Sequence, residues 1–176
     1  MHELGTAPRR ICANLPYNVA TPLLLGWLRQ APAFAAMTLM FQKEVADRLA
    51  AKVGDAGYGR LAIAAQWRAE VRRLFDVHPR AFTPPPKVDS TVVEIVPRAA
   101  PLAEADPDVL ERITAAAFGQ RRKMLRQSLR TLGVDAAALI AEAGLEPTRR
   151  AEELTIAQFC ALARTYRQMA ARGTGS

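Results

Sequence analysis

The chain has few of the residues that build disulfide frameworks or metal sites. Its 176 residues include two cysteines, Cys12 and Cys160, and two histidines, His2 and His78. These four residues show no metal-ligand spacing, and two cysteines do not make a disulfide framework. The sequence therefore predicts no metal site and suits the reducing conditions of the cytoplasm.

Long apolar stretches are also missing. The longest candidate, residues 31–41, is interrupted by Pro32 and Thr38 and falls short of the roughly 20 residues of a membrane span, so it suits a buried strand. The first residues show no positively charged region followed by an apolar core, so no secretory signal is predicted. What the chain does have is positive charge. A net charge of +7 and a pI near 10.1 favour a polyanionic partner, most simply a nucleic acid.

The tetrapeptide Asn14-Leu15-Pro16-Tyr17 follows a short apolar run that is typical of a strand. The Asn14 side chain can accept one N–H of an adenine amino group, and a backbone carbonyl of the turn, that of Pro16, can accept the other. The nitrogen lone pair is then available to attack an electrophilic methyl group. The Tyr17 ring offers a stacking partner to a base that has left its own stack. An ordinary strand-to-helix turn is the alternative interpretation.

A second motif occupies residues 82–90, Phe-Thr-Pro-Pro-Pro-Lys-Val-Asp-Ser. Three consecutive prolines exclude a helix interior and a central strand, so they predict a stiff extended loop. Such a loop can hold Phe82 in a fixed place. Phe82 is then either a core residue under the loop or a second ring that closes on a flipped base opposite Tyr17.

The two motifs resemble those of the KsgA family, the rRNA adenine N6,N6-dimethyltransferases. The similarity continues through residues 41–49, 58–61, 118–123 and 151–159, and covers nearly the whole chain in one order. The resemblance implies S-adenosyl-L-methionine as cofactor and two adjacent adenines of small-subunit (16S) rRNA as substrate. It also implies the 30S ribosomal subunit as partner, a role in ribosome biogenesis and a cytoplasmic location. The candidate catalytic residues are Asn14, Leu15, Pro16, Tyr17 and Phe82, and Asn14 is also a candidate cofactor-binding residue.

The glycine-rich loop of a Rossmann-like methyltransferase is not found in this sequence. Such an enzyme carries that loop after its first strand and an acidic residue after its second. Only residues 1–10 precede the strand that leads to Asn14, and the single Gly-x-Gly, residues 57–59, follows no strand and is interpreted as a turn. We therefore expect the chain to correspond to the C-terminal two-thirds of the family, as a fragment or truncated product, and to be inactive alone.

Strand and helix signals alternate over residues 1–98. Strands are predicted over 10–14, 37–41, 70–77 and 91–96. Helices are predicted over 23–29, capped by Thr21-Pro22, and over 43–51 and 60–67. The pattern predicts an α/β fold, the second half of a Rossmann-like class I methyltransferase sheet, in a partial catalytic domain. A half-sheet exposes an edge, so we expect self-association, a partner chain or poor stability.

After a linker at 99–104, residues 105–172 are predicted to form a small all-helical rRNA-binding domain. Its helices begin at Asp106-Pro107, span 121–132 and 135–143, and run from Thr155 to 171. The cations Arg121, Arg122, Lys123, Arg126 and Arg130 gather there with no acid among them, and with Lys87 they are the candidate RNA-binding residues. On the predicted helix, Arg122, Arg126 and Arg130 share one face, which is either a solvated face or a stripe that tracks phosphates.

Two other functions agree with parts of this pattern. The chain could be an RNA- or ribosome-binding protein without catalytic activity, because the basic helical region does not depend on a cofactor. A DNA adenine methyltransferase is the third interpretation, and the proline loop and the basic helical region argue against it.

Overall fold

The structure, a computed structural model, describes residue 6 and residues 8–173. The chain folds into two compact units. The first comprises the residues up to Ala51 and Ala64–Pro101, and the second comprises Lys52–Ile63 and the residues from Leu102 onward. The predicted division placed residues 52–63 in the first region, whereas the structure places them in the second. The reason is Tyr58, which is buried, donates its hydroxyl to the Leu154 carbonyl at 2.9 Å and packs edge-on against Phe118.

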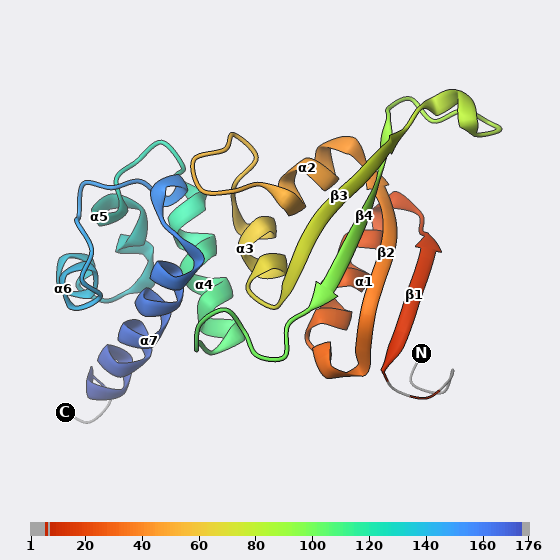
Figure 1. The fold of residues 1–176 in the computed structure, drawn as a ribbon. Coiled ribbons are helices and arrows are strands. Elements are labelled where there is room, and N and C mark those ends of the chain that lie inside the picture. Colours follow the sequence, from red (N-terminus) through yellow and green to blue (C-terminus); the bar gives the residue numbers. More distant parts are fainter. Residues whose placement is uncertain (1–5, 7, 174–176) are drawn as a thin grey trace. The chain divides into compact units, whose positions relative to one another are not determined.

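A mixed four-stranded sheet is the centre of the first unit (Figure 1). Its strands are β1 (Arg9–Asn14), β2 (Phe34–Gln42), β3 (Ala69–Val77) and β4 (Ser90–Pro97), in the order β1-β2-β4-β3. β1 and β2 are parallel, whereas β4 is antiparallel to both β2 and β3. All four predicted strands are present, and the α/β class is confirmed.

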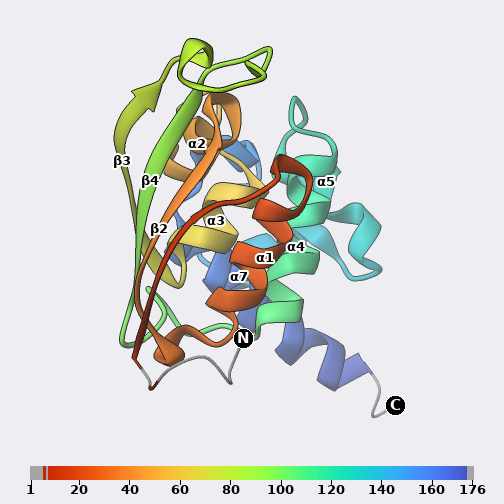
Figure 2. The same ribbon diagram turned by 90° about the vertical axis from the view of Figure 1, so that its right-hand side faces the viewer.

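Helices α1 (Tyr17–Leu28) and α2 (Lys43–Ala50) cover one face of this sheet (Figure 2). Side chains alternate between the two faces of a strand, so Leu39 and Phe41 of β2 point to the same side. Both are buried, as are Val93 and Ile95 of β4. The core of the first unit therefore lies between the sheet and these helices. A 3₁₀ turn at Ala31–Ala33 precedes β2, and α3 (Arg60–Gln66) precedes β3.

Helix α1 begins earlier than the sequence predicted. Thr21-Pro22 was expected to start it, but the helix starts at Tyr17 and contains Pro22. A proline inside a helix costs about 3 kcal/mol because it removes one backbone hydrogen bond and crowds the preceding turn. Burial offsets this cost. Leu24 and Leu28 are almost fully buried on one face of the helix, and each contributes about 1.5–3 kcal/mol.

The second unit contains helices and no strand among its described residues. The elements are α4 (Pro107–Gly119), α5 (Leu125–Ser128), α6 (Ala136–Glu142) and α7 (Ile156–Gly173), with 3₁₀ turns at Leu129–Leu132 and Ala151–Glu153. Predicted caps are in place: Asp106 accepts from the backbone N–H of Val109 at 3.1 Å, and Thr155 from that of Gln158 at 3.2 Å. None of the helices that the structure describes is long and apolar enough to cross a membrane.

The predicted helix over residues 121–132 is wrong. Residues 120–123 form a turn, Met124 makes an isolated β-bridge with Arg150, and only α5 and a following 3₁₀ turn are helical. The physical reason is competition for backbone donors. The N–H of Leu125 donates to the Arg149 carbonyl at 2.8 Å, so it does not continue a helix from residue 121. Arg122 therefore does not share a helix face with Arg126 and Arg130.

Candidate functional site

A pocket of about 350 Å³ lies where β1 ends and α1 begins. The structure brings together there all five predicted catalytic residues, Asn14, Leu15, Pro16, Tyr17 and Phe82. Three further residues line it that sequence reasoning did not assign: Met40, Pro84 and Pro86. Two segments that are far apart in the sequence thus form one concave site.

The end of β1 presents Asn14 at this pocket. Asn14 pairs with Met40 of the parallel strand β2, so the two side chains share the sheet face opposite Phe41 and the helices. The Asn14 side chain is exposed, and no described residue makes a hydrogen bond to its amide. Its oxygen is therefore open to an external donor.

Pro16 is the N-cap residue of α1, and its carbonyl is occupied. It accepts from the backbone N–H groups of Val19 at 3.0 Å and Ala20 at 3.1 Å, which uses both lone pairs. These two bonds disfavour the predicted role of this carbonyl as an acceptor for an adenine N–H. The carbonyl of Leu15, one residue earlier, has no hydrogen-bond donor among the described residues.

Tyr17, the first residue of α1, is half-buried with its ring at the pocket. Its hydroxyl lies 2.7 Å from the Ser90 hydroxyl, at the start of β4. Ser90 is fully buried. Sequence reasoning included Ser90 in the proline motif but assigned it no role, and no signal in the sequence links it to Tyr17.

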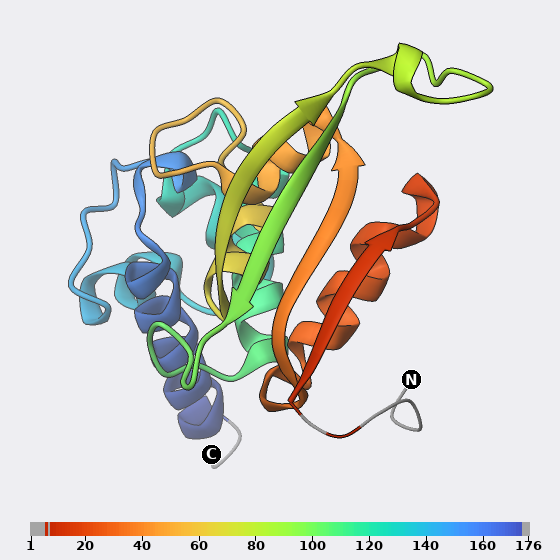
Figure 3. The same ribbon diagram turned by 45° about the vertical axis from the view of Figure 1, so that its right-hand side comes forward.

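Phe82 enters the pocket from the loop between β3 and β4, which projects beyond the strand ends (Figure 3). The loop starts with a 3₁₀ turn at Pro79–Ala81, closed by the N–H of Phe82 donating to the Pro79 carbonyl at 3.1 Å. Phe82 is half-buried. Lys87, on the same loop, is exposed and does not line the pocket.

Charged side chains fasten the base of this loop on the helix side of the sheet. Asp76 of β3 accepts from Lys43 of α2, from the Thr91 hydroxyl at 2.7 Å and from Arg73 at 3.0 Å. The bonds from Lys43, Thr91 and Arg73 hold the pKa of the Asp76 carboxyl well below its usual range. The backbone N–H of Lys43 also donates to the Asp89 carbonyl at 3.0 Å.

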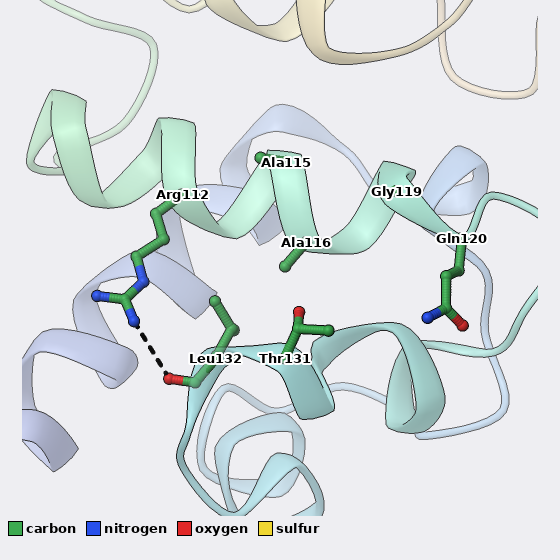
Figure 4. Close-up of a pocket in the computed structure, with 7 residues that line it drawn as sticks. All are labelled: Arg112, Ala115, Ala116, Gly119, Gln120, Thr131 and Leu132. Carbon is green, nitrogen blue, oxygen red and sulfur yellow. Dashed lines mark hydrogen bonds between the residues drawn. The ribbon is translucent and has the colours of Figure 1, made fainter.

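The predicted RNA-binding cations of the second unit lie around α5. Arg122, Lys123, Arg126 and Arg130 are exposed, whereas Arg121 pairs with Glu152 at 2.8 Å. A second pocket, of about 410 Å³, lies between α4 and the 3₁₀ turn after α5 (Figure 4). Arg112, which donates to the Leu132 carbonyl at 3.4 Å, and Gln120 lie at its two ends. The described residues hold no group of three or more potential metal ligands.

Residues 6–168 match the family model described as ribosomal RNA adenine dimethylase. The chain belongs to this family. It is 68% identical over 161 residues to ribosomal RNA small subunit methyltransferase A of Rhodospirillum rubrum, and this match covers 92% of the chain and 56% of the relative. It is 55% identical over 176 residues to the protein of that name from Azorhizobium caulinodans, covering 98% and 60%. The chain thus spans a little over half the length of these dimethylase relatives.

Two solved RNA-modifying enzymes have a similar fold. A dimethyladenosine transferase from Plasmodium falciparum matches with a TM-score of 0.81 at 25% identity, over 95% of this chain and 70% of that one. The 23S rRNA methyltransferase ErmE matches with a TM-score of 0.62 at 24% identity, over 94% and 69%, which shows similarity of fold alone.

Among the described residues, Asn14 was predicted to contact S-adenosylmethionine. Asn14 lies at the carboxyl end of a parallel strand, where nucleotide cofactors bind in α/β sheets. No glycine-rich loop follows any described strand. The Gly57–Gly59 segment lies in the second unit, in a turn around the buried Tyr58. Asn14 therefore stays the candidate for a cofactor contact among the residues that the structure describes.

Proposed function

We propose that the pocket binds an adenine base flipped out of RNA. Together with a site for S-adenosylmethionine, it would serve the dimethylation of the amino groups of two adjacent adenines in small-subunit (16S) rRNA. The observation that supports this most directly is the convergence of Asn14, Tyr17 and Phe82, from two segments far apart in the sequence, on one pocket. Membership of the ribosomal RNA adenine dimethylase family supports the proposal too, as does the similarity in fold to a dimethyladenosine transferase.

Asn14 and Leu15 would hold the adenine amino group. The Asn14 side-chain oxygen accepts one N–H and the Leu15 carbonyl accepts the other, because the Pro16 carbonyl already serves α1. Two acceptors placed on an amino group draw its lone pair out of conjugation with the ring. The nitrogen then becomes a better nucleophile. Pro16 takes part by starting the helix and fixing the turn.

Tyr17 and Phe82 would stack on the base. Stacking on an aromatic side chain contributes about 1–3 kcal/mol per base, and flipping a base out of its stack costs a few kcal/mol. Two rings are therefore enough to offset the cost for a weakly stacked adenine. Met40 lies beside Asn14 in the register and would form the floor of the site.

The RNA partner, in this proposal, is small-subunit rRNA within the 30S particle, in the cytoplasm where ribosomes are assembled. Lys87 and the exposed cations Arg122, Lys123, Arg126 and Arg130 would contact phosphates, and Arg121 less strongly because Glu152 pairs with it. The first unit would be the catalytic part and the second the RNA-binding part. β1 is an edge strand of the described sheet, so self-association through β1 also remains a proposal.

A second candidate function is RNA binding without catalysis. The exposed cations of the second unit, which do not depend on a cofactor, favour it for these 176 residues taken alone. Isothermal titration calorimetry with S-adenosylmethionine and with an rRNA hairpin separates the two functions. Binding of the hairpin without measurable binding of S-adenosylmethionine supports RNA binding alone, and a low-micromolar dissociation constant for the cofactor supports an active enzyme.

The adenine pocket is tested with an RNA hairpin that carries 2-aminopurine, a fluorescent analogue of adenine, at the target position. Stacking between Tyr17 and Phe82 should quench its emission when the chain binds. Tyr17→Ala and Phe82→Ala should each restore most of the emission, whereas Asn18→Ala, an exposed neighbour outside the pocket, should not. Full quenching in both ring variants would refute the pocket as an adenine site.

A further inference from the structure

The buried hydroxyl of Ser90 contacts Tyr17, and the proposed methyl transfer gives this contact no role. Ser90 is fully buried and begins β4, and its backbone pairs with Gln42 on one side and with Val77 on the other. Its hydroxyl has one partner among the described residues, the Tyr17 hydroxyl at 2.7 Å, from a residue 73 positions away. We propose that Ser90 is a positioning residue that holds the Tyr17 ring in its base-stacking orientation before RNA binds.

The sheet register supports this role. Ser90 and Val92 alternate with Thr91 along β4, and Val92 pairs with Met40, which lines the pocket. Ser90 therefore projects from the pocket face of the sheet, while Thr91 projects toward the helices. The Tyr17–Ser90 bond crosses the pocket face, between the turn that carries Asn14 and the end of the loop that carries Phe82.

The hairpin itself does not depend on the Ser90 hydroxyl. On the other face, Asp76 accepts from Lys43, Thr91 and Arg73, and the Lys43 N–H donates to the Asp89 carbonyl. The backbone of Ser90 is held in the ladders on both sides. The Ser90 hydroxyl is therefore held in place by the backbone of the sheet. Its hydrogen bond can orient the ring of Tyr17, which is only half-buried.

A ring held in place before binding loses less conformational entropy when the base arrives, so preorganisation raises affinity without a new contact. The hydrogen bond ties the hydroxyl end of the Tyr17 ring to Ser90, which does not itself line the pocket. This role of Ser90 rests on the proposed adenine pocket, whereas the orientation of Tyr17 in the free protein does not.

The first experiment measures the free 176-residue chain by NMR, with ¹³C label in the tyrosine rings. The chain has three tyrosines, and Tyr17→Phe assigns the Tyr17 signals. In the wild type, Tyr17 should occupy one side-chain rotamer. In Ser90→Ala it should average over several, while Thr91→Val, which removes a buried hydroxyl from the opposite face of the same strand, should leave it unchanged. A single, unchanged rotamer in Ser90→Ala would overturn the proposal.

The second experiment uses the 2-aminopurine hairpin in a double-mutant cycle. Ser90→Ala and Tyr17→Phe should each weaken the affinity for the hairpin, measured from the quenching, about three- to tenfold, as expected for one lost hydrogen bond. The double variant should bind no more weakly than either single variant, because both remove the same bond. Additive losses would overturn the coupling. If Tyr17→Ala leaves quenching intact, the adenine pocket fails, and with it the role of Ser90 in substrate binding. The NMR result distinguishes that failure from a failure of the Tyr17–Ser90 bond.

Discussion

The pocket of the first unit and the basic segment of the second were both predicted from short sequence patterns. The residues of the first pattern lie together as predicted, whereas those of the second do not share the predicted helix face. The Asn14–Tyr17 motif stands where a strand ends and a helix begins, so local rules place its residues. The stripe of Arg122, Arg126 and Arg130 required a continuous helix. That helix is absent because tertiary hydrogen bonds to Pro147 and Arg149 compete for its backbone donors. A periodic pattern is therefore weaker support for a site than a motif that includes its own turn.

Among changes to the pocket of the first unit, Asn14→Ala should have the largest effect on methyl transfer. In a full-length enzyme that carries these residues, we expect kcat to fall about 10²–10³-fold, as for other lost donors or acceptors that act on developing charge. KM should change little, because the bond strengthens as the amino nitrogen becomes tetrahedral. Steady-state methyl transfer to rRNA measures both constants, with Asn18→Ala as the matched control. A rate within about twofold of the wild type would contradict the role of Asn14.

Leu129→Ala tests which face of the basic segment matters for folding. Leu129 is fully buried at the start of the 3₁₀ turn, whereas its neighbour Arg126 is exposed. Leu129→Ala should lower the free energy of unfolding by about 2–5 kcal/mol, and Arg126→Ala should change it by less than about 0.5 kcal/mol. Urea unfolding followed by circular dichroism gives both values. Similar losses in the two variants would show that the cations hold the segment together.

The strands could be predicted because β2 and β4 are rich in apolar residues and are bounded by turn residues. The helix caps at Asp106 and Thr155 could be predicted from local hydrogen-bond chemistry. The start of α1 could not, since burial of Leu24 and Leu28 outweighs the local signal of Pro22. The Tyr17–Ser90 contact joins residues 73 positions apart, and such contacts leave no trace in one sequence.

The triple variant Arg122→Ala, Arg126→Ala, Arg130→Ala tests whether RNA uses these cations although they lack a common helix face. If each meets a phosphate, the slope of log K against log salt should flatten by roughly 2–3, at about 0.7–0.9 per phosphate contact. Replacing Arg164, Arg167 and Arg172 of α7 by Ala removes the same charge elsewhere and is the control. An unchanged slope in the first variant, with normal circular dichroism, would leave RNA contacts to Lys87 and the first unit.

Asp76→Asn should have the smallest effect, and its pH dependence identifies the cause. Because Lys43, Thr91 and Arg73 lower the folded-state pKa of Asp76, its carboxylate stabilises the hairpin base above the unfolded pKa of about 3.9. That contribution should be lost as pH falls through the folded-state value. Thermal unfolding from pH 7 to pH 2.5 should therefore show a lower Tm for Asp76→Asn at neutral pH and a gap that narrows as the pH falls below about 4. Asp89→Asn, an exposed aspartate of the same hairpin, is the matched control for removal of one negative charge. A gap that persists unchanged at pH 2.5 would mean that the charge of Asp76 does not fasten the loop that carries Phe82.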